Sequence, residues 1–342
     1  MNELILVTGG TGYIGSHTCV ELIESGYDVV IADNLSNSDI SVLEGIKEIT
    51  GKKPAFEKVD LADAGETSAF FDKYPGIKAI IHFAASKAVE ESVRMPLKYY
   101  SNNLNSLVNI LNDMIRKGIP NIVFSSSCTV YGEPDSIPVS ETAPIKKANS
   151  PYGNTKQICE EILQDTNKVN QQLKIIALRY FNPVGAHPSA LIGELPRGLP
   201  ANLVPFITQT AIGLRDELKV YGDDYDTSDG SAIRDYINVL DLSKAHVVAI
   251  NRLLSGKNKK GFEIFNLGTG RGVSVLEVIK TFEKVSGVKL KYRIVGRRDG
   301  DIEKVYANTE YANRELGWKS TKNLEETLLS AWKWEKYIRS KK

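Results

Sequence analysis

Three glycines near the amino terminus constrain the fold most strongly. They stand in the segment Thr8-Gly9-Gly10-Thr11-Gly12-Tyr13-Ile14-Gly15, between an apolar run at Leu4–Val7 and a helical pattern at Ile14–Glu24. In a strand–turn–helix unit, such glycines allow a tight turn, close approach of the backbone to a pyrophosphate, and tight packing of helix on strand. Free N–H groups at the helix start then bind the phosphates. The segment therefore predicts a dinucleotide site that involves Gly9, Gly12, Tyr13, Ile14 and Gly15.

Short apolar runs and helical patterns alternate through the first half of the chain. The predicted strands are Leu4–Val7, Val29–Ala32, Phe56–Val59, Ala79–Phe83, Asn121–Ser125 and Lys174–Arg179. The clearest helical patterns are Ile14–Glu24, Pro96–Lys117 and Tyr152–Gln172. This alternation predicts an α/β fold with a doubly wound, Rossmann-type parallel sheet and helices on both faces.

The regular alternation of strand and helix patterns ends after Asn182. Residues 183–202 are rich in glycine and proline and are expected to form a long loop, and shorter elements follow. The later predicted elements are strands at Lys219–Gly222 and Phe262–Leu267 and helices at Leu203–Gly213, Ser274–Val285 and Leu324–Tyr337. We therefore expect a nucleotide-binding domain at 1–182, to which later segments return, and a smaller C-terminal α/β substrate lobe at 183–342.

Composition excludes several classes of partner. The 342 residues carry a formal net charge of +1, so no basic field favours nucleic acid. The three cysteines show neither disulfide nor metal spacing, which predicts a reducing compartment and no bound metal. No stretch approaches the roughly 18 apolar residues of a membrane span, and no signal segment is evident. The chain is therefore expected to be a soluble, cytoplasmic protein.

Acidic residues at the ends of two strands suggest which dinucleotide binds. Asp33 lies about twenty residues after the glycines, where a carboxylate accepts hydrogen bonds from the ribose hydroxyls of NAD and repels a 2′-phosphate. Asn34 follows it in place of an arginine, which favours NAD over NADP. The alternative is that Asp33 only shapes a turn. Asp60 and Leu61 follow the third strand and either meet the adenine or form an ordinary strand-end turn.

Tyr152 and Lys156 are candidates for proton transfer. The preceding Pro151 places them near a helix start, and the i, i+4 spacing puts both side chains on one face. A tyrosine acting as a base near pH 7 needs a pKa about three units below its ordinary value. A nearby ammonium, the helix N-terminus and the positive ring of NAD favour such a fall. The pattern alone is common. Ser125 and Ser127 strengthen it, because they end the fifth strand at the edge where such sheets bind ligands.

Several motifs together resemble the extended short-chain dehydrogenase/reductase family, and within it the UDP-sugar 4-epimerases. The resemblance covers nearly the whole chain. The motifs are the glycine segment, Asp33-Asn34-Leu35, His82-Phe83-Ala84-Ala85, Lys87-Ala88-Val89, Ser125-Ser126-Ser127, Tyr152-Gly153-Asn154-Thr155-Lys156, Tyr180-Phe181-Asn182, Asn202-Leu203, Arg234-Asp235-Tyr236 and Arg297-Arg298-Asp299-Gly300-Asp301.

The resemblance implies a role for each of these residues. Tyr152 would take a proton from the sugar 4-hydroxyl with Ser127 in the relay, and Lys156 would bind the nicotinamide ribose and lower the tyrosine's pKa. Further NAD contacts would come from Phe83, Ala84, Ala85, Lys87, Asn102, Ser125 and Tyr180. The UDP-sugar would be held by Asn182, Asn202, Leu203, Arg234, Arg298 and Asp301, while Arg297 is expected to be a surface charge. A homodimer is implied as well, built on Pro96–Lys117 and Tyr152–Gln172.

Val305 is a departure from many similar bacterial proteins, which carry tyrosine at this place. A smaller side chain leaves room beside the C2 substituent of the sugar. We therefore expect the chain to accept UDP-N-acetylglucosamine and UDP-N-acetylgalactosamine as well as the plain sugars, unless backbone shifts close the pocket. The four histidines, His17, His82, His187 and His246, suggest only core or surface positions.

Three other functions are weaker alternatives. Nucleotide-sugar 4,6-dehydratases carry an Asp-Glu pair where Cys128-Thr129 stands here. A UDP-glucuronate decarboxylase needs arginine and hydroxyl contacts to a carboxylate, which the sequence does not identify. A non-catalytic NAD sensor commonly lacks the tyrosine and lysine, and both are present.

Overall fold

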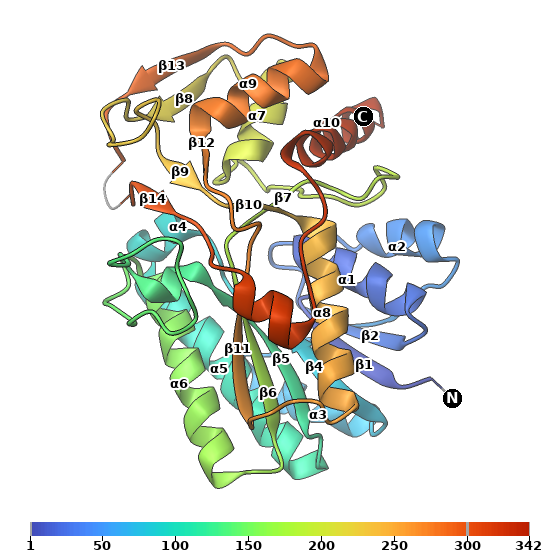
Figure 1. The fold of residues 1–342 in the computed structure, drawn as a ribbon. Coiled ribbons are helices and arrows are strands. Elements are labelled where there is room, and N and C mark those ends of the chain that lie inside the picture. The colour runs from blue at the N-terminus through green and yellow to red at the C-terminus, as the bar shows by residue number, and fades with distance from the viewer. Residues whose placement is uncertain (1, 299–300, 342) are drawn as a thin grey trace.

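A seven-stranded parallel sheet organises the first part of the chain and one later strand (Figure 1). The computed structural model describes residues 2–298 and 301–341. The strand order is β11-β6-β5-β4-β1-β2-β3. The strands are β1 (Leu4–Thr8), β2 (Asp28–Asp33), β3 (Ala55–Lys58), β4 (Ile77–His82), β5 (Asn121–Ser127), β6 (Lys174–Tyr180) and β11 (Phe262–Leu267). The predicted doubly wound, Rossmann-type fold is confirmed.

Helices cover both faces of this sheet, because its strands are apolar on both sides. Ile5 and Val7 of β1 pack on one face, and Leu6 between them packs on the other. The first face is covered by α1 (Tyr13–Glu24), α2 (Val42–Thr50) and α8 (Val239–Leu254). The second face is covered by α3 (Ala64–Lys73), α5 (Pro96–Lys117) and α6 (Pro151–Val169), while α4 (Val89–Arg94) precedes α5.

A second core lies in the upper lobe of Figure 1, where the later part of the chain gathers. Its helices are α7 (Leu203–Ala211), α9 (Val275–Ser286) and α10 (Leu324–Ser340). Its parallel strand pair is β8 (Leu218–Tyr221) with β13 (Tyr292–Val295). The remaining short strands are β7 (Asn182–Val184), β9 (Ile233–Arg234), β10 (Tyr236–Asn238), β12 (Val273–Ser274) and β14 (Lys304–Val305).

Two single-turn elements complete the description, a 3₁₀ turn at Cys128–Tyr131 and a π-helical turn at Ala312–Leu316. The division at residue 182 stays a prediction. The sheet itself draws on both sides of that position, because β11 pairs with β6 and α8 packs over the sheet. None of the helices in the described ranges combines the length and apolar character that crossing a bilayer requires.

Candidate functional site

The site lies at the carboxyl edge of the sheet, where the strand order reverses between β1 and β4. Helices leave the sheet in opposite directions from these two strands, which opens a crevice for a ligand. Many of the residues predicted to bind the cofactor stand at the ends of β1 to β6 or shortly after them, while Asn102 lies on α5 and Tyr152 and Lys156 lie on α6. The topology therefore gathers segments that lie far apart along the chain.

The glycine turn after β1 leaves a strip of backbone without side chains. Gly9 adopts a φ of +67°, and a Cβ added to it would lie 2.8 Å from the backbone nitrogen of Ala84. A Cβ on Gly15 would collide with the Gly9 carbonyl and lie 2.8 Å from Gly10 Cα. Gly12 is the N-cap of α1 and offers no capping side chain. The turn therefore packs too closely for side chains at Gly9 and Gly15, and a helix N-terminus without a capping side chain fits the pyrophosphate of NAD.

Asp33 is held firmly at the end of β2. Its carboxylate, 8% exposed, accepts the Thr11 N–H at 3.2 Å and the Leu35 N–H at 2.9 Å. The Ser38 hydroxyl donates to the same carboxylate at 3.2 Å. Asp33 therefore shapes the turn and ties it to the glycine segment. The sequence patterns did not single out Thr11 or Ser38, because small hydroxyl residues in a turn carry no distinctive signal.

Asp60 and Leu61 lie at the end of the outermost strand. Asp60 is exposed, and its carboxylate accepts the Ala62 N–H at 3.0 Å, as in an ordinary turn. Leu61 is buried among the side chains under α3 and α5. Their contact with adenine stays a prediction.

The segment after β4 approaches the glycine turn. Thr8 at the end of β1 links that strand to β4 and the residues after it. Its hydroxyl accepts the Ala84 N–H at 3.3 Å and contacts His82 Nδ1 at 2.8 Å. The buried Asn103 fixes the next residues: it accepts the Ser86 N–H at 2.8 Å and donates to the Ser86 carbonyl at 3.0 Å. The sequence analysis selected Asn102, whose amide donates to Asn103. The signal that was missed is a polar residue on the buried face of α5.

Tyr152 lies in the first turn of α6, and its pKa is raised in the protein alone. Ser150 caps this helix by accepting the Gly153 N–H at 3.1 Å. Burial raises the pKa of Tyr152 to about 12, and a hydrogen bond with Ser127 lowers it only in part. In the protein alone, desolvation of the phenolate outweighs the helix spacing. The predicted fall of this pKa, which depends on Lys156 together with the positive ring of bound NAD, stays a prediction.

Lys156 is buried beside the same strand. Its ammonium donates to the Ser125 carbonyl at 2.6 Å and lies 4.7 Å from the centroid of the Phe124 ring. Burial lowers the pKa of Lys156 to about 8. The structure thus brings Ser125, Ser127, Tyr152 and Lys156 together at the end of β5, and a group that exchanges protons near neutral pH stands among them.

A second group of predicted residues meets beside this edge. Arg234 forms an ion pair with Asp301, and its neighbour in the β9–β14 pairing is Val305. Asn182 donates its N–H to the Asp235 carbonyl at 2.9 Å, which places β7 beside them. Val305 is 6% exposed and packs with Phe181. The upper lobe therefore presents a guanidinium, an amide and a small apolar side chain to one region.

Three further predicted residues come from separate segments. Asn202 precedes α7 and donates to Glu194 at 2.7 Å, and Lys87 lies 3.6 Å from the same carboxylate. Arg298 stacks at 4.7 Å over the Tyr221 ring, and its carbonyl accepts the N–H of Asp301, the partner of Arg234, at 3.1 Å. Arg297 pairs with Asp224 at the surface, as expected. Asp299 and Gly300 of the quoted motif lie outside the described residues.

The histidines are buried rather than poised for catalysis. Burial lowers the pKa of His17 and His82 to about 3 and that of His246 to about 4. His246 nevertheless touches the site, because its Nε2 lies 2.5 Å from the Tyr180 hydroxyl and its ring packs 4.7 Å from that of Phe83. No sequence pattern indicated this contact.

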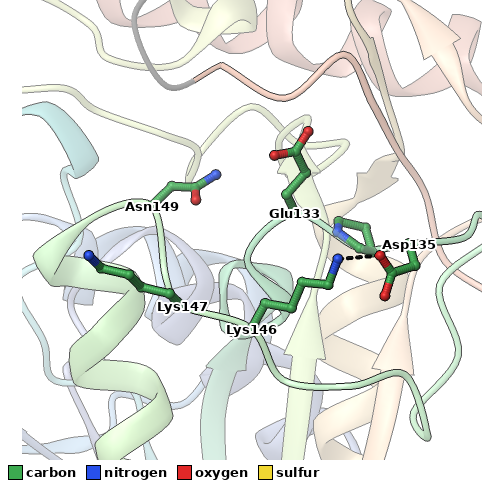
Figure 2. A pocket seen from close by; sticks show the side chains of 6 residues that line it. Glu133, Asp135, Lys146, Lys147 and Asn149 are labelled. Carbon is green, nitrogen blue, oxygen red and sulfur yellow. Dashed lines mark hydrogen bonds and ion pairs between the residues drawn. The ribbon is translucent and has the colours of Figure 1, made fainter.

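A polar depression of about 390 Å³ lies beside the site, over the loop that links the 3₁₀ turn to α6. Figure 2 shows its lining, in which Lys146 pairs with Asp135. A smaller hollow of about 280 Å³ shares Glu133 and Asn149 with it and reaches Asp301 and Ile302. The smaller hollow therefore borders Asp301, and neither hollow is lined by the proton-transfer residues.

The chain is similar in sequence to a known protein family. A family model described as "NAD dependent epimerase/dehydratase family" matches residues 5–268. The chain is 50% identical to the UDP-glucose 4-epimerase of Bacillus subtilis (strain 168) over 331 residues, which are 97% of this chain and 96% of that one.

Two solved structures are also closely similar. One is the UDP-glucose 4-epimerase of Stenotrophomonas maltophila with bound NAD and formylated UDP-arabinopyranose. It has a TM-score of 0.95 and 48% identity over the whole of both chains. The other is that of Bifidobacterium longum in complex with NAD+ and UDP. It has a TM-score of 0.94 and 45% identity over 98% of this chain and 99% of that one.

Proposed function

The chain belongs to the NAD dependent epimerase/dehydratase family, and from this premise we propose that it interconverts UDP-glucose and UDP-galactose by inverting C4 of the sugar. The observation that carries the proposal is the meeting of Tyr152, Ser127 and Lys156 at the carboxyl end of β5, beside the glycine cradle. This arrangement joins a proton-transfer group to a dinucleotide site. Incubating the purified protein with UDP-galactose and measuring UDP-glucose tests it.

Each group in the site has a distinct task. Tyr152 takes the proton of the 4-hydroxyl with Ser127 in the relay, and it returns a proton to the C4 oxygen of the 4-keto sugar after the sugar has turned. Lys156 holds the nicotinamide ribose. NAD, when bound, accepts and returns the hydride and contributes the positive charge of its oxidised ring. The phenol therefore needs help to ionise, since burial alone raises its pKa.

Inversion also requires a firm hold on the diphosphate and a loose hold on the sugar. Guanidinium groups match phosphate oxygens, so Arg234 and Arg298 are the proposed anchors. Asn182, Asn202, Leu203 and Asp301 complete the UDP-sugar contacts. The sugar can then turn about its link to the diphosphate between the two hydride transfers.

Val305 gives a prediction about the sugar. It is small and lies in an apolar cluster next to Arg234, so the chain is proposed to accept UDP-N-acetylgalactosamine as well as UDP-galactose. In Val305→Tyr, the phenol fills that space and N-acetyl activity should fall by roughly 100-fold, with UDP-galactose turnover changed only a few-fold. Initial rates with both substrates decide it, and Val305→Ala is the control that keeps the space open. Turnover of UDP-galactose but not of the N-acetyl sugar by the unaltered protein contradicts the idea.

A homodimer is also proposed, through the outer faces of α5 and α6. Leu97 at the start of α5 is 81% exposed and Val169 at the end of α6 is 80% exposed, which is unusual for apolar residues of this size. Leu97→Asp should convert the dimer to a monomer, because a charge in an apolar interface stays unpaired. Light scattering after size exclusion measures the mass. Leu199→Asp, at a leucine that is 67% exposed in the loop before α7, serves as control. A dimer that survives Leu97→Asp argues against this interface.

The cytoplasm is the proposed compartment. Cys19, Cys128 and Cys159 are all free, which suits reducing surroundings.

A further inference from the structure

A buried carboxylate one helical turn beyond Lys156 links the catalytic helix to the sheet. Glu160 is 4% exposed and accepts the Ser126 hydroxyl at 2.5 Å. Arg179 donates two hydrogen bonds to the same carboxylate, from Nε at 3.0 Å and from Nη2 at 2.6 Å. Ser126 and Arg179 are partners in the register of β5 and β6. One side chain of α6 therefore holds two neighbouring strands.

The strand residue that Glu160 holds stands between two residues of the site. Ser125 accepts from Lys156 and Ser127 faces Tyr152, while Ser126 points to the opposite side of β5. A shift of Ser126 would move both neighbours, because they share its backbone. Glu160 thus affects the position of the proton-transfer groups without contacting them.

The contacts continue to the segment that follows Ser127. The Arg179 guanidinium stacks 4.7 Å above the Tyr131 ring, and the Tyr131 hydroxyl donates to Asn266 of β11 at 2.6 Å. The Ser127 hydroxyl accepts the Thr129 N–H at 3.2 Å at the start of the same 3₁₀ turn. Both ends of this turn are therefore fixed, one by Ser127 and one by the partners of Glu160.

The charge of Glu160 matters as well as its shape. The titratable groups around Lys156 and Tyr152 are Cys159 and Glu160 on α6, His82 on β4, Tyr99 on α5, Cys128 directly after β5, and Arg179 and Tyr180 on β6. Burial keeps most of them neutral: it raises the pKa of Cys159 to about 11, lowers that of His82 to about 3, and raises those of both tyrosines. The carboxylate of Glu160 is the anion of this set, and it opposes the loss of the Lys156 proton.

We propose that Glu160 is a positioning residue that fixes α6 against β5 and β6 and places a negative charge one helical turn from Lys156. The proposal rests on the proposed function and adds a residue to it. A buried ion pair as such contributes little net stability, and apolar replacements often fold as well. Its value here lies in the charge that it places next to the lysine.

The test compares Glu160→Gln with Glu263→Gln. Glutamine keeps the shape of Glu160 and removes the charge. Glu263 near the start of β11 forms a similar buried pair with Arg252, at 2.7 and 2.8 Å, away from the carboxyl edge of the sheet. In Glu160→Gln, the alkaline limb of kcat for UDP-galactose should move to lower pH by about one unit. The lysine loses its proton earlier because an opposing charge is gone. KM should change by no more than about twofold.

A readout without substrate accompanies the rates. The Lys156 titration is followed by NMR of lysine labelled with ¹³C at Cε, with Lys156→Met for assignment, and its midpoint should fall by the same amount. If Glu160→Gln does not fold, Arg179→Gln replaces it. It removes the cation paired with Glu160, so the Lys156 midpoint should rise instead of fall.

An unmoved alkaline limb and an unmoved Lys156 midpoint in the folded variant overturn the inference, as does an equal shift in Glu263→Gln. If the unaltered protein does not convert UDP-galactose to UDP-glucose, the proposed function is overturned and not the inference about Glu160.

Discussion

Replacing Tyr152 by phenylalanine should lower kcat for UDP-galactose by about 10³-fold, with KM changed only a few-fold. The ring keeps its place in the buried turn of α6, so the loss is confined to the hydroxyl that exchanges the proton. The residual rate reflects binding and orientation alone. Initial rates and the reduction of bound NAD by UDP-sugar, followed at its absorbance, are the measurements.

The matched control is Tyr27→Phe. Tyr27 lies in the turn between α1 and β2, at the opposite edge of the sheet, and its hydroxyl contacts Asn251. The kcat of Tyr27→Phe should equal that of the unaltered protein. Full-speed epimerisation by Tyr152→Phe would refute the proposed role of the phenol.

Gly15→Ala should weaken NAD binding by at least about 100-fold, equivalent to about 2.7 kcal/mol. The added methyl would collide with the Gly9 carbonyl and lie 2.8 Å from Gly10 Cα, and both are backbone atoms that no side-chain rotation can move. The start of α1 must then move away from the turn, which takes the free N–H groups with it. Titration calorimetry of the NAD-free protein measures the affinity.

The control for this change is Gly76→Ala, because a Cβ there meets nothing within 4 Å. The free energy of unfolding should fall by about 1–3 kcal/mol in Gly15→Ala, as for other overpacked sites, and change little in the control. Unchanged NAD affinity in Gly15→Ala would show that the turn has room to adapt.

The sequence predicted the sheet well, because its strands are short apolar runs bounded by turns. The helix α8 was missed, although it covers the centre of one face. Residues such as Asp241, Ser243 and His246 are buried in it alongside its apolar ones, so no polar face marks its periodicity. The position of β11 at the end of the sheet depends on pairing with β6 across the whole upper lobe, which local pattern does not reveal.

The residues of the site were predicted more completely than their chemistry. Motifs identified Ser127, Tyr152 and Lys156, which the fold brings together. Spacing along a helix identified residues that share a face, but the desolvation that raises the pKa of Tyr152 in the protein alone could not be predicted from it. The contact of Glu160 with Arg179 was not predicted either, since it joins two elements whose neighbourhood only the folded chain defines.

The place of β11 has a consequence for how the chain matures during synthesis. Until residue 267 has left the ribosome, the backbone groups along one side of β6 have no partner strand, and an open strand invites pairing with other nascent chains. The nucleotide-binding half therefore finishes folding only after most of the other half has been made. A fragment that stops near residue 182 would keep this edge exposed and would be prone to aggregate.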